Sequence, residues 1–504
     1  MAEPVVLHLD SVTKRFGSFA ANDNISVTLH RGEVVALLGE NGAGKTTLMN
    51  ILFGHYVPDA GRVFIHGQEI AQGKPKAAIA AGVGMVHQHF SLAKNLTVLE
   101  NVMTGTEPLF GWASDTAKGR QKLLALEQKF GLSVNPDARV GDLSVGEQQR
   151  VEILKALYND ARILILDEPT GVLTQQEAEG LFQTLRAMAQ DGLSIIFISH
   201  KLHEVMSGAD RVVVLRAGKV TAERATSETS KEELAELMVG RRVERPVREA
   251  TEAGDVVVRA RDVRLARGAR RLSDISFDIR AGETLGIVGV SGNGQAALCD
   301  LVAGVVPPDS GMFEINGQSL GQMSPRDLSR MNVGRTPEDR NTQGAVGELT
   351  LWENAVLERI TDPRFSRRGF LRKGPARSYC QDLIDRFDVR GGTPGSRISL
   401  LSGGNMQKLI LGRSLAQQPV FLLAAQPTRG LDEGAIAAIH EDILAARKAG
   451  TAVLLVSEDL DEVISLSDRI MAIHDGRLSP AVDARGVDAR QLGLMMAGEW
   501  EGMR

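Results

Sequence analysis

The sequence has 504 residues, of which 43% are hydrophobic and 24% are charged, and its formal net charge is -5 at pH 7. This length predicts about two to four globular domains, and the slightly acidic balance excludes a nucleic-acid binder held by bulk charge. With only two cysteines, Cys299 and Cys380, a disulfide framework or cysteine metal site is excluded and a reducing compartment is indicated. No apolar run approaches the ~20 residues that span a membrane, and the N-terminus lacks the pattern of a signal peptide. We therefore expect any work at a membrane to depend on a partner.

The first chemical motif, GENGAGKT at residues 39–46, fits the phosphate-loop pattern G-x-x-x-x-G-K-[ST]. An apolar strand is predicted before it at 34–39, and a helix after it. Backbone N–H groups of such a loop form an anion site, to which the helix N-terminus adds its positive dipole end. Lys45 would place a charge on the outer phosphates, and the Thr46 hydroxyl would bind Mg²⁺. The alternative, a glycine-rich turn that binds nothing, is disfavoured by the order of strand, loop and helix. The predicted nucleotide-binding residues here are Gly39, Glu40, Asn41, Gly42, Ala43, Gly44, Lys45, Thr46 and Thr47.

The second motif is ILILDE at residues 163–168. Its apolar residues predict a buried strand, and Asp167 then emerges at the carboxyl edge, where open α/β sheets bind ligands. Asp167 would hold Mg²⁺ through water, while Glu168 would orient the attacking water and accept its proton. A strand that ends in Asp-Glu commonly has only a structural role. Its occurrence together with a phosphate loop favours the interpretation that these two residues are catalytic.

Apolar strands alternate with amphipathic stretches, which predicts an α/β fold around a mainly parallel core sheet. Residues 177–192 have helical periodicity, and Gly192 is expected to end that helix. Residues from about 90 to 145 lack strand patterning and predict a separate helical subdomain.

The sequence is a tandem duplication. RGEVVALLGENGAGKTTL at 31–48 matches AGETLGIVGVSGNGQAAL at 281–298, a shift of 250 residues. LSVGEQQR at 143–150 matches LSGGNMQK at 401–408, where the shift has grown to 258. We therefore place a surface insertion in the second copy between roughly 338 and 401.

Two domains and a connector follow from the repeat. The first domain is predicted at residues 1–242 and the second at 256–504. Between them, residues 243–255 are polar, contain one proline and lack apolar periodicity, so they are predicted to be a linker.

LSVGEQQ at 143–149 and LSGGNMQ at 401–407 resemble the signature sequence of ABC ATPases, and the resemblance covers nearly the whole chain. It implies two tandem P-loop NTPase domains, each with a mainly parallel core sheet, an antiparallel β part and a helical subdomain. It also implies that Gln88 is the Q-loop glutamine, a catalytic residue and Mg²⁺ ligand, and that His200 is the switch histidine. Phe16 would stack on adenine, although a lone aromatic residue often belongs to a core.

In the family, two such domains pair head to tail, and each ATP lies between one phosphate loop and the opposite signature. The resemblance implies that the halves pair within this chain. Glu168, His200 and Gln88 would be catalytic, and Thr46, Gln88 and Asp167 would bind the metal. The second half would complete this ATP site with Ser402, Gly403, Gly404, Asn405 and Asp432.

The other predicted site has lost its chemistry. Gln295 stands at the phosphate-loop lysine, and Gln426 stands at the general base. Ala296 stands at the phosphate-loop threonine, Ala425 at the metal-binding aspartate, Glu338 at the Q-loop glutamine and Glu458 at the switch histidine. In the first half, Thr174 stands at the position that matches Asp432. We therefore expect an ATPase with one hydrolytic site per chain.

The tandem arrangement, together with AAQPTRGLD and SEDLDEV, resembles the fused ATPase subunits of bacterial simple-sugar and nucleoside importers. The segments 84–105 and 336–357 look closer to the nucleoside branch. The resemblance implies two membrane permease subunits, an extracytoplasmic substrate-binding protein and no nucleic acid. The chain would lie at the cytoplasmic side of the cell (inner) membrane, attached only through the permeases.

Two other functions are alternatives to a nucleoside importer. A simple-sugar importer of the ribose or galactose type is the nearest alternative. A soluble tandem ABC translation factor is disfavoured, because that type usually has two intact sites and a long charged linker. The permease-docking surface is expected around His89, Phe90 and Leu92, and around 338–354.

Overall fold

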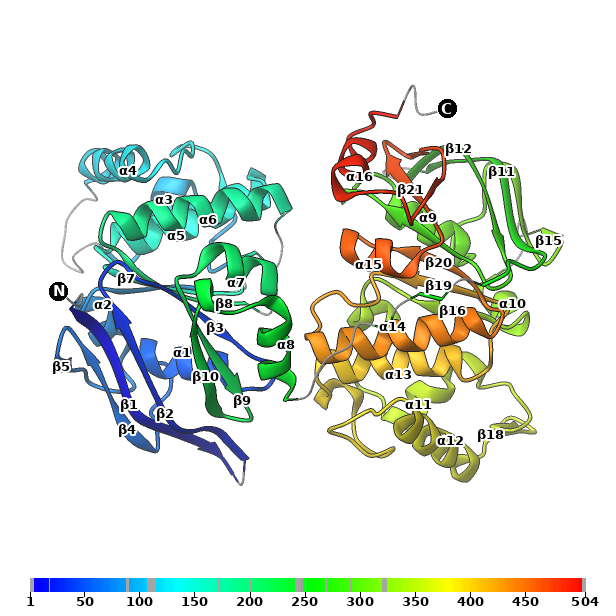
Figure 1. Ribbon diagram of the computed structural model, residues 1–504, viewed down its shortest axis with the longest axis horizontal. Coiled ribbons are helices and arrows are strands. Elements are labelled where there is room, and N and C mark those ends of the chain that lie inside the picture. The colour runs from blue at the N-terminus through cyan, green and yellow to red at the C-terminus, as the bar shows by residue number, and fades with distance from the viewer. Residues whose placement is uncertain are drawn as a thin grey trace. The chain divides into compact units, whose positions relative to one another are not determined.

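The computed structural model describes residues 4–17, 19–87, 90–106, 115–170, 173, 175–199, 201–240, 246, 248–249, 251–267, 270–290, 292–319 and 324–500. The chain divides into two compact units, Met1–Val243 and Glu244–Arg504. Both units combine a mainly parallel sheet, an antiparallel sheet and helices, which confirms the predicted α/β class (Figure 1).

The first unit contains a parallel sheet in the strand order β10-β9-β3-β8-β7-β6, in which only the pair β9–β10 is antiparallel. A separate antiparallel sheet has the order β2-β1-β4-β5. The strands are β1 (Val5–Phe16), β2 (Phe19–His30), β3 (Val34–Leu38), β4 (Ala60–Ile65), β5 (Gln68–Glu69), β6 (Val83–Val86), β7 (Ile163–Asp167), β8 (Ser194–Ile198), β9 (Arg211–Arg216) and β10 (Lys219–Ala225). The helices are α1 (Lys45–Phe53), α2 (Pro75–Ala80), α3 (Val98–Met103), α4 (Thr116–Phe130), α5 (Val145–Tyr158), α6 (Gln175–Gln190), α7 (Leu202–Gly208) and α8 (Lys231–Val239).

Strand β3 is buried on both faces, which explains its unbroken apolar sequence VVALL. Its odd and even residues serve different cores, because successive side chains of a strand point to opposite faces. Val34, Ala36 and Leu38 pack with the helices α3, α5 and α6. Val35 and Leu37 pack instead against α1 and the antiparallel sheet. In Figure 1 the helices α3–α6 accordingly lie across the parallel sheet from β1 and β2.

The predicted helical subdomain is confirmed for the described residues between 90 and 145. They form α3, α4 and a short 3-10 turn at Val140–Asp142, with one isolated bridge between Thr97 and Arg139. Helix α3 begins with a capping box, in which Thr97 accepts from the Glu100 N–H while Glu100 accepts from the Thr97 N–H. The helix α6 ends at Gln190, and Gly192 follows with a φ of 94°.

The second unit repeats this architecture. Its larger sheet has the order β16-β19-β20-β13-β21-β22, and its antiparallel sheet has the order β12-β11-β14-β15. The strands are β11 (Val256–Arg267), β12 (Arg270–Arg280), β13 (Thr284–Val288), β14 (Ser310–Ile315), β15 (Gln318–Ser319), β16 (Val333–Thr336), β17 (Ser366–Arg367), β18 (Phe370–Leu371), β19 (Phe421–Ala425), β20 (Ala452–Val456), β21 (Arg469–His474), β22 (Arg477–Leu478) and β23 (Val482–Asp483). The helices are α9 (Gln295–Val302), α10 (Pro325–Arg330), α11 (Leu351–Val356), α12 (Lys373–Arg386), α13 (Gly403–Leu415), α14 (Glu433–Lys448), α15 (Leu460–Leu466) and α16 (Ala489–Met496).

The two insertions of the second copy fall inside the predicted interval. A π-turn at Arg340–Gly344 follows β16, and the hairpin β17–β18 lies between α11 and α12. Part of the predicted linker packs on the second unit, since Arg447 Nη1 donates to the Glu249 carbonyl at 3.0 Å. Lys448 also forms a 2.7 Å ion pair with the Glu249 carboxylate.

Candidate nucleotide site

The phosphate loop connects β3 to α1, as predicted. Gly42 and Gly44 have φ angles of 85° and 99°, a region that favours glycine. Lys45 is 5% exposed, and its Nζ donates to the carbonyls of Gly39 at 2.6 Å and Glu40 at 2.9 Å. The ammonium group thus lies under its own loop, where its charge is available to a phosphate.

Asn22 on β2 supports this loop, and the sequence reasoning missed it. Asn22 is fully buried, and its Nδ2 donates to the Gly44 carbonyl at 3.0 Å. A Cβ at Gly44 would collide with the Ala21 carbonyl, so glycine is required there. The second copy has Leu272 at the matching position, and β2 contains several other polar residues, so the sequence did not single out Asn22.

Asp167 and Glu168 lie at the carboxyl end of β7. Asp167 is 6% exposed and accepts a hydrogen bond from the Thr46 hydroxyl. Burial, reinforced by the neighbouring Glu168 carboxylate, raises the pKa of Asp167 to about 6, although Lys45 and Thr46 act to lower it. This carboxylate and hydroxyl are the donor pair that Mg²⁺ takes in phosphate-loop enzymes. No cluster of three or more His, Cys, Asp or Glu side chains suited to a metal occurs in the described part of the chain.

Glu168 adopts a strained backbone with a φ of 47°, and its N–H donates to the Ile198 carbonyl at 3.1 Å. Left-handed backbone in a non-glycine residue carries a cost and is found preferentially at functional sites. Gln426 in the second unit has the same geometry, with a φ of 46° and its N–H bonded to Val456 at 2.7 Å. The second unit has therefore kept this backbone geometry and carries an amide where the first unit has a carboxylate.

Substituting Asp167 by asparagine is expected to stabilise the nucleotide-free protein while abolishing hydrolysis. The folded state holds the Asp167 proton up to about pH 6, whereas the unfolded chain releases it at the ordinary pKa of 3.8. Stability from this proton is fully present below 3.8 and is lost as the pH rises through about 6. At pH 7.5 the ionised group therefore costs stability, and its removal should raise the unfolding midpoint by about 5 °C. Calorimetry at pH 7.5 and 4 measures this, because the gain should vanish at the lower pH.

Asp442 on α14 provides the matched control. Burial and the adjacent Glu441 also raise the pKa of Asp442 to about 6. Its asparagine variant should gain similar stability and retain ATPase activity. An Asp167→Asn protein with the wild-type midpoint at pH 7.5 would refute the assigned cost.

The two signature segments each open a helix, but their caps differ. Ser144 caps α5, and the Glu147 carboxylate accepts from the Ser144 hydroxyl at 2.8 Å and from its N–H at 2.9 Å. Ser402 caps α13, and there the Asn405 Nδ2 donates to the Ser402 hydroxyl oxygen at 2.9 Å. The Ser402 proton is thus free to be donated to a ligand, whereas the Ser144 proton is directed to a carboxylate.

The other residues predicted to come from the second half lie near Ser402. A Cβ at Gly404 would be 3.2 Å from Ala435 on α14, so the two helices approach closely at this point. Asp432 caps α14 by accepting from the Ala435 N–H at 2.9 Å. The structure therefore brings Ser402, Gly403, Gly404, Asn405 and Asp432 to the adjoining starts of two helices.

Arg340 is a second residue that the sequence reasoning missed. Its Nη1 donates to the Arg429 carbonyl at 2.7 Å, and its Nη2 lies against Gly403, where a Cβ would be 2.7 Å away. The pKa of Arg340 is lowered, mainly because burial removes water from the charged guanidinium. The first-half residue that matches Gly403 is Val145, and Arg340 lies in the interval where the second copy is longer than the first. Only this correlation between insertion and glycine could have indicated the contact.

The degenerate phosphate loop holds Gln295 in place of lysine. Gln295 is 8% exposed, and its Nε2 donates to the Val290 carbonyl at 3.0 Å, as Lys45 does to the matching Glu40. Glu338 forms a 2.6 Å ion pair with Arg429. These side chains maintain the loop and its surroundings without the positive charge that phosphates require.

Some predicted residues cannot be placed. Gln88 and His200, together with His89 and Thr174, lie outside the described residues. Phe16 is 48% exposed and touches Tyr56 edge-on at a centroid distance of 5.8 Å, so it is not a core residue. Leu92 packs inward on the helical subdomain, which leaves half-buried Phe90 as the docking candidate of the first half that is described, beside the segment 338–354 of the second half.

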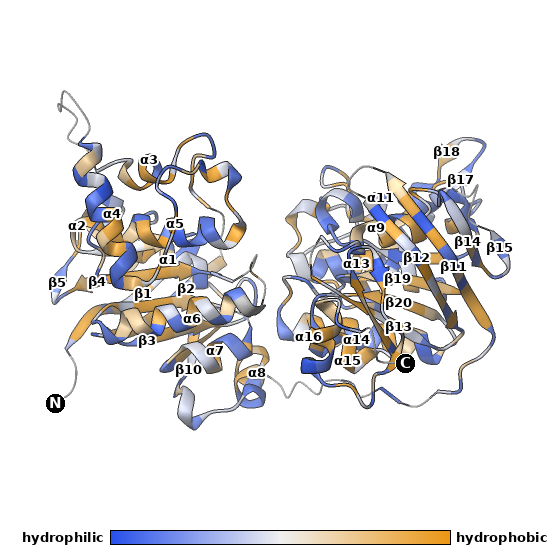
Figure 2. Cartoon of the chain, turned by 90° about the horizontal axis from the view of Figure 1, so that it is seen from above, coloured by the Kyte–Doolittle hydropathy of each residue, from blue (hydrophilic) through white to orange (hydrophobic). Residues whose placement is uncertain are grey.

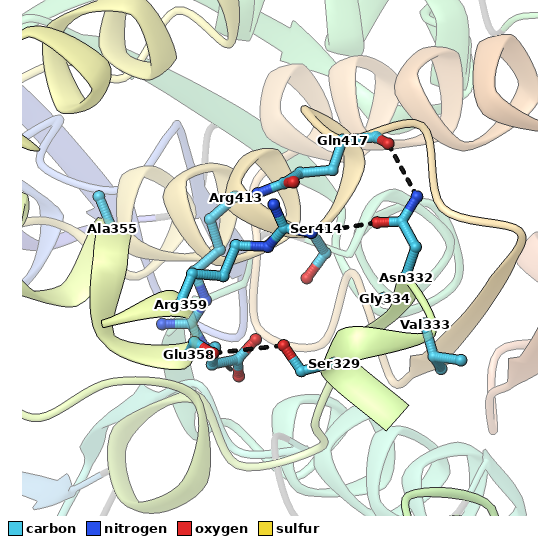
Figure 3. Close-up of a pocket in the computed structure, with 10 residues that line it drawn as sticks. All are labelled: Ser329, Asn332, Val333, Gly334, Ala355, Glu358, Arg359, Arg413, Ser414 and Gln417. Carbon is cyan, nitrogen blue, oxygen red and sulfur yellow. Dashed lines mark hydrogen bonds and ion pairs between the residues drawn. The ribbon is translucent and has the colours of Figure 1, made fainter. Parts of the chain in front are cut away.

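A small pocket in the second unit is separate from this chemistry. It lies between α10, β16 and α13, where the side chains of Arg413, Arg359 and Glu358 converge (Figure 3). Arg413 donates to the Asn354 carbonyl at 3.2 Å and pairs with Glu358 at 3.1 Å. The volume of the pocket is about 20 Å³, which admits about one water molecule. The pocket therefore cannot hold a nucleotide.

A family model described as "ABC transporter" matches residues 22–171 and 272–429, once in each unit. The chain belongs to the ABC transporter family. It is an ATPase subunit of this family, with a nucleotide-binding domain in each half. In the part of the chain that the structure describes, no helix has the length and apolar character needed to span a bilayer.

Curated relatives align over nearly the whole ABC chain. A nucleoside import ATP-binding protein of Lactococcus lactis, NupA, is 44% identical over 99% of both chains. A glucose import ATP-binding protein of Haloferax volcanii, TsgD13, is 43% identical over 99% of this chain and 96% of its own. A guanosine import ATP-binding protein of Bacillus subtilis, NupO, is 42% identical over 98% of this chain and 97% of its own.

The tandem fold also matches a solved structure. An archaeal ribosome recycling factor, crystallised with a ribosomal stalk protein, is 20% identical and aligns with a TM-score of 0.65 over 97% of this chain and 92% of that one. At this identity the likeness concerns the fold alone.

Proposed function

We propose that the chain energises an ABC importer of nucleosides by hydrolysing ATP at one composite site. The observation that carries the proposal is the asymmetry of the two halves. The first half has Lys45, Asp167 and Glu168, and the second has Gln295, Ala425 and Gln426 at the matching positions. Two of the three relatives described above import nucleosides, which favours this class of solute.

In this proposal the two halves pair within the chain, and ATP with Mg²⁺ lies between the first phosphate loop and the second signature. Lys45 neutralises the outer phosphates, and Thr46, Asp167 and Gln88 hold the metal. Glu168 activates water, with His200 beside the γ-phosphate and Phe16 on the adenine. The Ser402 hydroxyl and the N-terminus of α13 add a second anion site, while Asp432 completes the facing loop.

We further propose the partners that such an importer needs. Two permease subunits would carry the solute, and an extracytoplasmic binding protein would deliver it. The chain would then lie on the cytoplasmic side of the membrane and would reach the permeases near Phe90.

Sugar import is the second candidate, and the observation that favours it is the 43% identity to a glucose import subunit. A translation factor is less favoured. The recycling factor shares the fold at 20% identity, and the loss of lysine and base from one half removes the second hydrolytic site expected of that class.

Measurements of uptake by cells that lack this chain test which solute the importer carries. We expect such cells to lose import of labelled nucleosides, to keep import of glucose and ribose, and to recover with the wild-type chain. A Lys45→Met chain should restore about 10- to 100-fold less uptake, because it loses charge-assisted phosphate contacts of about 1.5–3 kcal/mol. The matched Gln295→Met chain should restore normal uptake. Loss of sugar import with intact nucleoside import would select the alternative.

A further inference from the structure

The hairpin β17–β18 is a rigid projection of the second unit. Its strands pair Ser366 with Leu371 and Arg367 with Phe370. The turn residues Arg368 and Gly369 have φ angles of 50° and 82°, and two positive φ angles at the centre of a two-residue turn make a stiff hairpin. Phe365, directly before the hairpin, is 1% exposed and packs on Tyr379 at a centroid distance of 5.1 Å. The hairpin is therefore anchored at its base, and Figure 2 places β17 and β18 at the rim of their unit.

Phe370 is the most exposed large hydrophobic side chain in the described part of the chain, with 80% of its surface accessible. Leu371 beside it is 41% exposed. A phenyl ring that is exposed to water on a turn does not gain the free energy that burial of apolar surface usually provides. This arrangement indicates a partner that covers the ring.

The surroundings of Phe370 are strongly basic. Residues 363–377 contain six basic side chains and no acidic one. They are Arg364, Arg367, Arg368, Arg372, Lys373 and Arg377, all exposed. None of them forms an ion pair within the described residues.

Some of these basic side chains interact with residues of the second unit itself. Arg364 lies over the rings of Phe365 and Tyr379 at 5.3 and 5.1 Å. Lys373 and Arg377 help to lower the pKa of Glu353, after its hydrogen bonds to Thr350. Arg367, Arg368 and Arg372 are left around Phe370 without a compensating carboxylate.

We propose that this hairpin binds the anionic headgroups of a lipid bilayer. Guanidinium groups bind phosphates through paired hydrogen bonds, and basic segments gain about 1 kcal/mol per residue near an anionic leaflet. An aromatic ring among them enters the boundary between headgroups and acyl chains. The charge favours a lipid surface over a protein groove, because the cations surround the ring without a patterned counterpart. The segment 104–115 at this place in the first half contains no basic residue, so the contact belongs to the second half.

Vesicle binding by the purified full-length chain tests the proposal. Co-sedimentation with vesicles of 70% phosphatidylcholine and 30% phosphatidylglycerol should exceed that with phosphatidylcholine alone. The Arg367→Gln/Arg368→Asn variant should bind the anionic vesicles roughly 25-fold less, from about fivefold per residue. Phe370→Ser should bind about tenfold less. A Phe370→Trp chain should show blue-shifted emission that brominated acyl chains quench.

Matched variants keep the result interpretable. Val305→Ser removes a half-exposed apolar side chain elsewhere on the same unit, and Arg477→Gln/Arg490→Asn removes two exposed charges away from the hairpin. Both should bind vesicles like the wild type. Equal losses in test and control variants would overturn the proposal. So would binding that appears only in vesicles containing the permeases, which would make the hairpin a permease contact, or hairpin-dependent binding to RNA with none to lipid.

Discussion

Replacing Glu168 by glutamine is expected to lower the steady-state ATPase rate of the assembled transporter by about 100- to 10,000-fold, the range that a general base supplies. Glutamine keeps the size of the side chain and the left-handed backbone of Glu168, so the protein should fold normally. The amide cannot accept a proton from water. Nucleotide affinity should therefore persist or rise, since removal of a carboxylate near the phosphates relieves repulsion.

Gln426 provides the internal control for Glu168. Its φ of 46° and its hydrogen bond to Val456 reproduce the backbone of Glu168, so Gln426→Ala perturbs an equivalent position without a base. We expect its rate to stay within about twofold of the wild type, because the Gln426 amide cannot act as a general base and its removal therefore takes no such group from the reaction. Equal losses in the two variants, or near-normal hydrolysis by Glu168→Gln, would contradict a single hydrolytic site.

The parts of the site that the sequence predicted are those fixed by local backbone geometry. Lys45 lies beyond the loop that follows the buried strand β3, and Asp167 is the last residue of the buried strand β7. Parallel strands bring their carboxyl ends to one edge. The apolar runs VVALL and ILIL were therefore sufficient to place both residues. The family model and full-length relatives confirm the resemblance from which the importer class was inferred.

The parts that the sequence did not predict depend on packing between distant segments. Asn22 reaches Gly44 from another strand, and Arg340 reaches Gly403 across 63 positions of the chain. Neither side chain has a periodic or motif signal, since each acts through tertiary contacts with residues elsewhere in the chain. The same applies to the direction of the Ser402 hydrogen bond, which became apparent only from the position of the Asn405 amide.

The direction of the Ser402 hydrogen bond leads to a second prediction with a large expected effect on the ATPase rate. In the proposed composite site, the Ser402 hydroxyl donates its proton to the γ-phosphate, because Asn405 occupies its oxygen as a donor. An Asn405→Glu variant would reproduce the first signature, in which Glu147 accepts from the Ser144 hydroxyl. The Ser402 proton would then be withdrawn from ATP, and a carboxylate would stand beside the phosphate. We expect the ATPase rate at saturating ATP to fall about 10- to 100-fold, from the loss of a hydrogen bond to a charged group worth about 1.5–3 kcal/mol.

The mirror substitution separates this effect from helix capping. Glu147→Asn gives the first signature the neutral cap of the second, and it should leave the rate nearly unchanged because the site it faces in the proposal lacks a base. Asn405→Gln keeps a neutral amide and should retain most activity, whereas a purely structural role for the cap would make the Glu147 and Asn405 variants equally harmful. Steady-state kinetics of the three proteins thus decide whether the second half contributes a phosphate ligand to the site whose base is Glu168. If it does, the exchange of a carboxylate for an amide at Asn405 is the counterpart of the lost base at Gln426: one half retains the hydrolytic groups, and the other presents the neutral helix start that a phosphate can approach.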